Sequence, residues 1–232
     1  MILSILMPAY NEESTIEEIL RRIQKSDIKH IKKEIVIVDD GSKDNTAKIV
    51  KRLMKKWKNI KFIQHKKNQG KGAAMRTAIK HASGDIAIVQ DADLEYDPND
   101  YWRVIEPIVN GSAQVVYGSR RLEKQHKKHS GFLFFLGGWS LTWITNILYL
   151  IRITDEATCY KAFKLNLLKS IPLACKRFEF CPEVTAKVAK RGIKIKEVPI
   201  SYYPRSVEEG KKINYKDWFE AVFTLIKYRF RS

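Results

Sequence analysis

Short apolar runs alternate with amphipathic segments through the first half of this chain, and this alternation limits the folds that it can adopt. Five runs have the length and β-branched content of strands: residues 2–7, 34–39, 60–64, 86–90 and 113–118. Between them apolar residues recur at helical spacing, and we expect helices over residues 13–25, 45–57 and 71–82 and from Pro98 onward. Alternating elements of this kind predict an α/β fold with a parallel, doubly wound sheet.

The charge of the chain narrows the choice of partner. Its 232 residues include 43 lysines and arginines against 26 aspartates and glutamates, which gives a net charge of +17. Such a charge suits nucleic acid, an anionic membrane surface or phosphorylated substrates. No helix-turn-helix, zinc or RNA-recognition signature accompanies the charge, so a nucleic-acid-binding module is the weaker alternative.

Polar side chains follow three of the predicted strands at the point where each strand ends. The three segments are Pro8-Ala9-Tyr10-Asn11-Glu12, Asp39-Asp40-Gly41-Ser42 and Asp91-Ala92-Asp93. Because the carboxyl ends of parallel strands meet at one edge of a sheet, we expect these segments to form a nucleotide-sized pocket. The paired carboxylates of Asp91 and Asp93 suit a Mg²⁺ or Mn²⁺ ion that also touches a diphosphate. Each segment taken alone could equally start a turn.

Individual side chains in these segments suit a nucleotide. Asp39 can accept a hydrogen bond from a base imide or a ribose hydroxyl, and Tyr10 offers a ring on which a base can stack. The segment Asn68-Gln69-Gly70-Lys71-Gly72 opens the helix over 71–82, and a helix N-terminus can receive phosphate. The Walker spacing is absent, so close backbone approach is the favoured role of these glycines.

In their order and spacing, these segments resemble the family 2 inverting glycosyltransferases of the GT-A fold, and most of all the dolichyl- or polyprenyl-phosphate hexose synthases. Further matches are Tyr117-Gly118-Ser119-Arg120, residues 155–161, residues 197–200 and Arg205. The resemblance implies a Rossmann-like, mostly parallel sheet flanked by helices. It also implies metal-dependent, inverting transfer of a hexose, with mannose favoured, from a GDP- or UDP-hexose to polyprenyl or dolichyl phosphate.

The resemblance also implies roles for single residues. The residues implied to bind the nucleotide-sugar are Pro8, Ala9, Tyr10, Glu12, Val38, Asp39, Asp40, Lys71, Asp91 and Ala92. The implied cofactor is Mg²⁺ or Mn²⁺, and its candidate ligands are Asp91, Asp93 and Glu95. The candidates for binding the acceptor phosphate are Arg120, Arg205, Lys211 and Lys212, and those for catalysis are Asp93, Arg120 and Arg205.

The charge of the acceptor decides whether the reaction needs a base. A lipid monophosphate has a second pKa of about 6, so it is mostly dianionic at neutral pH and needs cations rather than a base. An acceptor hydroxyl, as in polysaccharide or glycolipid synthesis, would need a general base, and Asp155 and Glu179 would be the candidates. Otherwise Asp155 is expected to cap the segment that follows it, and Glu179 to pair with Lys176 or Arg177.

Two segments of the second half suit a membrane surface. Residues 132–151 carry no charge and are long enough to span a bilayer, yet their polar residues fall on one helical face. Those polar residues are Thr142, Thr145, Asn146 and Tyr149. With tryptophans on the other faces and a basic flank, this pattern favours an interfacial helix over a core helix or a spanning segment. In residues 215–231, core packing and membrane contact are equally favoured.

We therefore expect one domain over residues 1–232, with a nucleotide-sugar-binding half at 1–120 and an acceptor-side half at 121–232. The interfacial helices would lie near 132–151 and 215–231. Residues 1–7 have the pattern of a first strand rather than a signal peptide, and the spacing of the three cysteines indicates reduced thiols. These features favour peripheral membrane association on the cytoplasmic side, and they leave the oligomeric state open.

Overall fold

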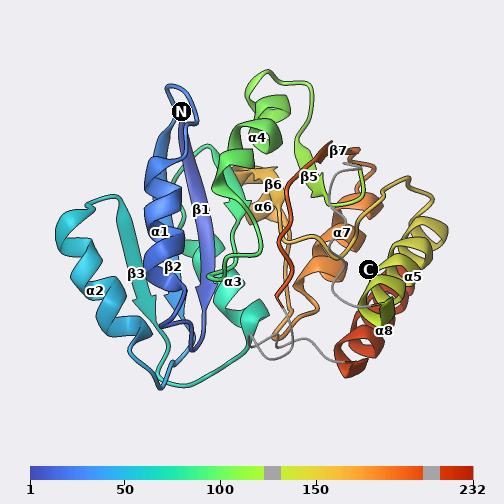
Figure 1. Ribbon diagram of the computed structural model, residues 1–232. Coiled ribbons are helices and arrows are strands. Elements are labelled where there is room, and N and C mark those ends of the chain that lie inside the picture. Colours follow the sequence, from blue (N-terminus) through green and yellow to red (C-terminus); the bar gives the residue numbers. More distant parts are fainter. Residues whose placement is uncertain (123–131, 206–214, 232) are drawn as a thin grey trace.

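A single seven-stranded sheet runs through the computed structural model, which describes residues 1–122, 132–205 and 215–231 (Figure 1). The strand order is β3-β2-β1-β4-β6-β5-β7. The strands are β1 (Ile2–Ala9), β2 (Lys32–Asp39), β3 (Ile60–Gln64), β4 (Ile86–Val89), β5 (Val115–Ser119), β6 (Lys161–Lys164) and β7 (Ile195–Pro199). Of these seven strands in the described ranges, only β6 pairs antiparallel, with β4 on one side and β5 on the other. The predicted α/β fold with a mostly parallel sheet is confirmed.

Helices cover both faces of the sheet, and a helical pair lies beyond its β7 end (Figure 1). They are α1 (Ile16–Lys25), α2 (Thr46–Lys56), α3 (Lys71–His81), η1 (Pro98–Asp100), α4 (Tyr101–Val109), α5 (Phe132–Tyr149), α6 (Leu165–Ser170), α7 (Phe180–Lys190) and α8 (Tyr215–Phe230). On one face α1 contacts α2 and η1, and on the other α3 contacts α6 and α7. The outer pair is α5 and α8, which pack on each other and on α7.

The core follows the periodicity of the sequence. The strand β1 is covered on both faces, so its residues are apolar without alternation except for the buried Ser4, and Leu3, Ile5 and Leu6 are fully buried. In α1 the buried residues are Ile16, Ile19, Leu20 and Ile23, which recur at helical spacing. Each strand and helix predicted in the first half is present, with boundaries within a few residues of those expected.

The second half departs most from what its sequence pattern suggests. The short strand β6 begins at Lys161, whose side chain is fully buried, and neither its length nor its composition marks it as central. The helix expected over 132–151 is present as α5, but its polar residues Thr142, Thr145 and Tyr149 face inward and are buried. Within the three described ranges, no helix has the length and apolar character needed to cross a bilayer.

The glycine-rich turn before α3 joins the two halves of the chain. Gly70 has a φ of +95°, and the first amides of α3 are bonded to the segment before α7. The N–H of Gly72 donates to the carbonyl of Arg177 at 2.8 Å, and that of Ala73 to the carbonyl of Lys176 at 3.0 Å. The predicted close backbone approach is confirmed, and these donors serve the fold rather than a phosphate.

We expect Gly70→Ala to destabilise the protein more than Gly111→Ala. A Cβ atom on Gly70 would lie 2.3 Å from the carbonyl oxygen of Lys176, whereas Gly111 has a similar positive φ with nothing within 4 Å. Left-handed strain alone should cost Gly111→Ala about 1 kcal/mol, and the added overlap at Gly70 about 1–3 kcal/mol more. Urea denaturation measures both variants, and equal losses would show that the turn is not tightly packed.

Candidate active site

The carboxyl ends of β1, β2 and β4 lie side by side, and this brings the three polar segments of the sequence together. In the register of the sheet Ala9 pairs with Asp39, and Leu6 pairs with Val89. A threonine that the sequence analysis did not single out connects the segment after β1 to the segment after β4. Thr15 donates to the carbonyl of Ala92 at 2.9 Å, and its hydroxyl lies 3.1 Å from a carboxylate oxygen of Glu12. The predicted meeting of these segments at one edge is confirmed.

Arg205 closes on the carboxylates at this edge from far along the chain. Its guanidinium lies 2.8 Å from Asp93 Oδ2 and 3.5 Å from Glu12 Oε2. Its backbone N–H donates to Glu95 Oε1 at 2.9 Å. Both the side chain and the backbone of Arg205 are therefore held against the acidic cluster, which consists of Glu12, Asp91, Asp93 and Glu95. Arg205 was predicted to contact phosphate, and the structure places it directly beside the paired carboxylates.

The acidic cluster is electrostatically strained. Burial, together with the negative charges of Asp91 and Glu95, raises the pKa of Asp93 to about 7, although Arg205 opposes the shift. Burial alone would lower the pKa of Arg205, but the carboxylates of Asp93, Glu12 and Glu95 outweigh burial and raise it. Carboxylates crowded together in this way favour additional positive charge near Asp91 and Asp93.

The other carboxylate of the pair is held by a lysine. Lys71, the first residue of α3, lies 2.6 Å from Asp91 Oδ1, and both side chains are partly exposed. Burial alone would lower the pKa of Lys71, but Asp91 more than compensates and raises it. Each member of the carboxylate pair therefore has a cation of the protein itself beside it, with Lys71 on Asp91 and Arg205 on Asp93.

A closed metal cage is not part of this arrangement. Among the described residues, no group of three or more His, Cys, Asp or Glu side chains is placed to hold a metal ion. Glu95, predicted as a third ligand, instead accepts hydrogen bonds from the hydroxyl of Tyr202 at 3.2 Å and the N–H of Arg205. Mg²⁺ usually binds through one or two carboxylates plus substrate phosphates, so Asp91 and Asp93 fit an ion that a diphosphate completes.

Asp39 is the last residue of β2 and lies buried at the same edge of the sheet. Its Oδ2 accepts a hydrogen bond from the side-chain amide of Gln64 at 2.9 Å, and its Oδ1 accepts one from the hydroxyl of Ser42. The carboxylate is buried, and Tyr10 stands half-buried just after β1. Four of the residues predicted to bind the nucleotide-sugar have apolar side chains and are also buried, namely Pro8, Ala9, Val38 and Ala92.

Asp40 has a different role from its neighbour. Its Oδ2 accepts hydrogen bonds from the N–H groups of Gln69 at 3.1 Å and Gly70 at 2.7 Å. Its Oδ1 lies 2.7 Å from Nδ1 of His65. The side chain predicted to bind the nucleotide thus stabilises the turn that presents Lys71 to Asp91.

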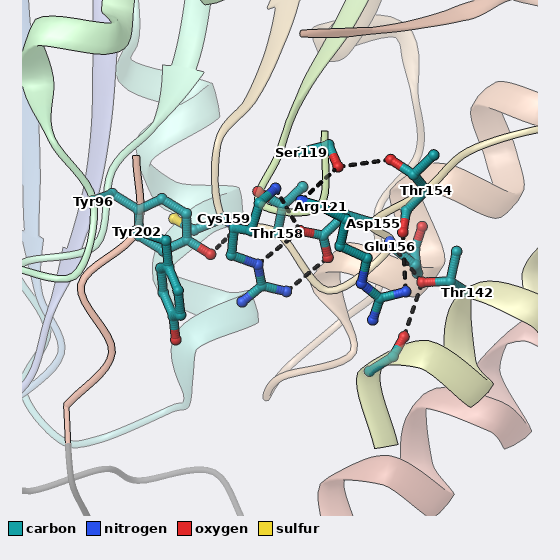
Figure 2. Close-up of polar contacts among 12 residues, drawn as sticks. Tyr96, Ser119, Arg121, Thr142, Thr154, Asp155, Glu156, Thr158, Cys159 and Tyr202 are labelled. Carbon is teal, nitrogen blue, oxygen red and sulfur yellow. Dashed lines mark hydrogen bonds and ion pairs between the residues drawn. The ribbon is translucent and has the colours of Figure 1, made fainter. Parts of the chain in front are cut away.

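A second arginine lies near the cluster. Arg120 donates from Nε to Asp155 Oδ2 and from Nη2 to Asp155 Oδ1, both at 2.7 Å. Its guanidinium carbon lies 4.9 Å from the ring centre of Tyr202, whose hydroxyl donates to Glu95. Figure 2 shows Tyr202 and Tyr96 on one side of the Asp155 segment. Arg120 is therefore connected through Tyr202 to the acidic cluster around Arg205.

The residues proposed as bases for a hydroxyl acceptor are both engaged. Burial would raise the pKa of Asp155, but Arg120 outweighs burial and lowers it, so the carboxylate is held ionised. Glu179 accepts hydrogen bonds from the backbone N–H groups of Lys176 at 2.7 Å and Arg177 at 2.8 Å. The expected pairing of Glu179 with those side chains is replaced by this backbone contact. Lys211 and Lys212 lie outside the described residues.

Gln90 is a residue of the site that the sequence analysis missed. It directly precedes Asp91, is fully buried, and its side-chain oxygen accepts from the hydroxyls of Tyr101 and Tyr160, each at 2.7 Å. These bonds fix the point at which β4 opens into the acidic segment. A polar residue at the end of an otherwise apolar run was the signal that could have identified it.

Comparisons with known proteins identify the family of this chain. Residues 4–166 match the family model described as "Glycosyl transferase family 2". A UDP-N-acetylglucosamine–dolichyl-phosphate N-acetylglucosaminyltransferase of Methanococcus voltae is 35% identical over 91% of this chain and 90% of its own length. A dolichol-phosphate mannosyltransferase of Pyrococcus furiosus is 31% identical over 91% of this chain, which spans 59% of that relative.

Solved structures show the same fold. A glucosyl-3-phosphoglycerate synthase from Mycobacterium tuberculosis, crystallised with Mn²⁺, uridine diphosphate and phosphoglyceric acid, matches with a TM-score of 0.73 at 20% identity. The match covers 100% of this chain and 79% of that one. The same synthase was also crystallised with Mg²⁺ and uridine diphosphate. Our chain belongs to glycosyltransferase family 2 and has its GT-A fold.

Proposed function

We propose that this protein transfers a hexose from a nucleotide-sugar to a dolichyl or polyprenyl phosphate, with inversion at the anomeric carbon. The observation that carries this proposal is the pair of arginines linked through Tyr202 and Glu95. Arg205 lies against the carboxylates where a donor diphosphate would sit, and Arg120 presents a second cation nearby. Two neighbouring cationic positions suit a reaction between two phosphorylated substrates.

The acceptor phosphate needs no base in this scheme. Asp155 takes up two of the N–H donors of Arg120, and the guanidinium, which is partly exposed, has further N–H donors that can bind phosphate oxygens. A dianionic phosphate is already a nucleophile, and the arginine reduces its repulsion from the donor. Attack on the side opposite the leaving diphosphate inverts the anomeric centre. A hydroxyl acceptor is less well served, because Asp155 and Glu179 are both committed to other contacts.

Asp91 and Asp93 would hold a Mg²⁺ or Mn²⁺ ion. When bound, the ion supplies a Lewis acid that neutralises negative charge on the departing diphosphate. Lys71 and Arg205 orient the two carboxylates through ion pairs, and Glu95 orients Arg205 through its backbone. The chemistry of the donor set therefore fits the metal predicted from the sequence.

The sugar is the open part of the proposal. The family resemblance favours mannose, whereas the named relatives include transferases of N-acetylglucosamine, mannose and, in Trichomonas vaginalis, glucose. A panel of UDP- and GDP-sugars with a short-chain polyprenyl phosphate, with and without chelator, identifies donor and acceptor together. We expect one nucleotide-sugar to be used in the presence of Mg²⁺ or Mn²⁺. Absence of transfer to any lipid phosphate would contradict the proposed acceptor class.

Asp93→Ala should abolish transfer, with turnover at least about 100-fold lower, because it removes charge that holds the leaving diphosphate through the ion. The substitution also leaves Arg205 without its closest partner, so circular dichroism and a melting curve check that the variant is folded. Glu106→Gln, an exposed change on α4, serves as the control and should keep wild-type turnover. Near-normal turnover of Asp93→Ala with metal present would refute the assignment.

Direct binding of Mn²⁺ gives a test that does not depend on sugar transfer. Electron paramagnetic resonance should show Mn²⁺ binding more tightly in the presence of UDP or GDP than alone, because the diphosphate completes the coordination. Asp93→Asn and Asp91→Asn should each weaken this binding by about tenfold or more. Equal Mn²⁺ affinity in these variants and in wild type would place the ion elsewhere.

A second part of the proposal concerns the outer surface of α5 and α8. We define the apolar face as the exposed large apolar side chains of these helices and of the residue after α5. They are Phe135, Leu136, Trp139, Trp143, Ile147, Leu150, Tyr215, Phe219, Phe223, Ile226 and Phe230. Trp143 is 57% exposed and Phe223 is 66% exposed, and the two helices pack side by side (Figure 1). Many exposed large apolar side chains on two neighbouring helices favour an interaction site.

A lipid bilayer is the partner that best fits the apolar face. Three arginines lie at or near the apolar face. The guanidinium carbon of Arg121 lies 5.6 Å from the ring centre of Phe135, and Arg229 and Arg231 are exposed at the end of α8. Tryptophans and cations together are typical of the boundary between headgroups and acyl chains. The net charge of +17 favours anionic lipids, and an acceptor with a polyprenyl chain is itself found in a membrane.

The double substitution Trp143→Ser/Phe223→Ser should weaken binding to vesicles without changing the charge of the protein. We expect co-sedimentation with vesicles of phosphatidylcholine and phosphatidylglycerol to fall by about tenfold or more, because two large apolar side chains no longer enter the lipid. Lys55→Ser, on α2 far from the apolar face, should leave most of the binding intact. Unchanged sedimentation of the double variant would exclude a bilayer, and a dimer that dissociates in the same variant would indicate self-association.

A further inference from the structure

We propose that Asp155 acts as a positioning residue for Arg120, and that the inner face of α5 holds Asp155 in place. The helix whose outer side carries the apolar face would thereby set the position of the arginine that receives the acceptor phosphate. This inference rests on the proposed function, because it assigns a role within that reaction. It gives Asp155 a purpose other than that of a general base.

The contact between Asp155 and Arg120 is made on three atoms. Besides the two guanidinium bonds, the backbone N–H of Arg120 donates to Asp155 Oδ2 at 3.0 Å. The side chain of Asp155 is 0% exposed, whereas that of Arg120 is 21% exposed. A paired, two-pronged contact of this kind fixes the plane of the guanidinium as well as its location. The exposed part of Arg120 is therefore presented in one orientation.

The segment that carries Asp155 is clamped by polar side chains of α5 on both sides. The amide of Asn146 donates to the carbonyl of Ile153 at 2.8 Å and accepts from its N–H at 3.0 Å. Thr142 accepts from the N–H of Glu156 at 3.0 Å (Figure 2). Two residues of the polar stripe that the sequence showed on this helix, Thr142 and Asn146, therefore bind the segment 153–156.

The sheet holds the same segment from the other direction. Glu197 of β7 accepts from the N–H groups of Thr154 at 2.7 Å and Asp155 at 3.1 Å. At the end of β5 the hydroxyl of Ser119 lies 2.6 Å from that of Thr154, and Arg121 donates to the carbonyl of Thr154 at 3.0 Å (Figure 2). Asp155 is thus fixed between α5 and the sheet, and its position follows that of both.

This arrangement connects the two sides of α5. Its outer side bears Trp139, Trp143 and Ile147, and its inner side bears Thr142 and Asn146. A helix that rests on lipid with one side and holds residues 153–156 with the other places Arg120 at a fixed height above the bilayer. A phosphate attached to a membrane-embedded chain is confined to that height, so alignment with Arg120 matters more than it would for a soluble acceptor.

A double-mutant cycle separates positioning from base catalysis. In the wild-type background Asp155→Asn should lower kcat/KM for a short-chain polyprenyl phosphate by about tenfold, mainly through KM. In an Arg120→Gln background the same change should have little further effect, because the residue that Asp155 positions is already gone. Affinity for the nucleotide with Mn²⁺, measured by calorimetry, should stay near the wild-type value in each variant that melts as a folded protein.

A matched pair of substitutions tests the role of α5. Thr142→Val removes the acceptor for the N–H of Glu156, whereas Thr145→Val removes only a bond from the threonine hydroxyl to the carbonyl of Leu141 in the same helix. Both threonines are buried on the inner side of α5. We expect Thr142→Val to raise KM for the lipid phosphate severalfold and Thr145→Val to leave it unchanged.

Each outcome has a distinct meaning. Losses that multiply in the double variant, or a pH profile of kcat that loses its acidic limb in Asp155→Asn, would identify a base and overturn the positioning role. If Thr142→Val and Thr145→Val changed KM for the lipid phosphate equally, α5 would not be what holds Asp155 in place. If the wild-type protein neither binds nor glycosylates a polyprenyl phosphate, the proposed function fails and this inference fails with it.

Discussion

Two buried carboxylates, each neutralised by an arginine from a distant part of the chain, hold the site in its shape. Asp93 pairs with Arg205, and Asp155 pairs with Arg120. A carboxylate buried to this extent without a cation would cost several kcal/mol, so the loops that carry the arginines must close on the sheet for the fold to be stable. The hydrogen bond between Tyr202 and Glu95 then connects one pair to the other.

The same charges that stabilise the fold are suited to the reaction. A family 2 glycosyltransferase brings a nucleotide-sugar to an acceptor, and in the proposed reaction both partners carry phosphate. Lys71 and Arg205 lie beside Asp91 and Asp93, where the donor is proposed to bind, while Arg120 lies against the ring of Tyr202. Because the cations are oriented before any substrate arrives, little reorganisation is needed when negative charge moves during transfer.

The helix α5 has its polar side inside and its apolar side outside, which is the reverse of a helix on a water-exposed surface. Two of the inward polar side chains, those of Thr142 and Asn146, bond to residues 153–156, and the exposed apolar residues of the outer side are continued by those of α8. Both halves of this reversal were present in the sequence as one polar stripe on an uncharged segment. The sequence did not indicate which side faced the protein, because periodicity gives the faces of a helix but not their direction.

Sequence alone determined the strands of the first half of the sheet, because their apolar runs are distinct from the helical spacing between them. It also determined that their polar ends meet, because parallel strands have their carboxyl ends at the same edge of a sheet. It also identified Asp91 and Asp93 as a pair from their spacing. Only the tertiary structure decided that β6 inserts between β4 and β5, that Arg205 reaches Asp93 across 112 positions, and that Asp155 holds Arg120. These contacts depend on how distant segments pack, and no local pattern of residues encodes that packing.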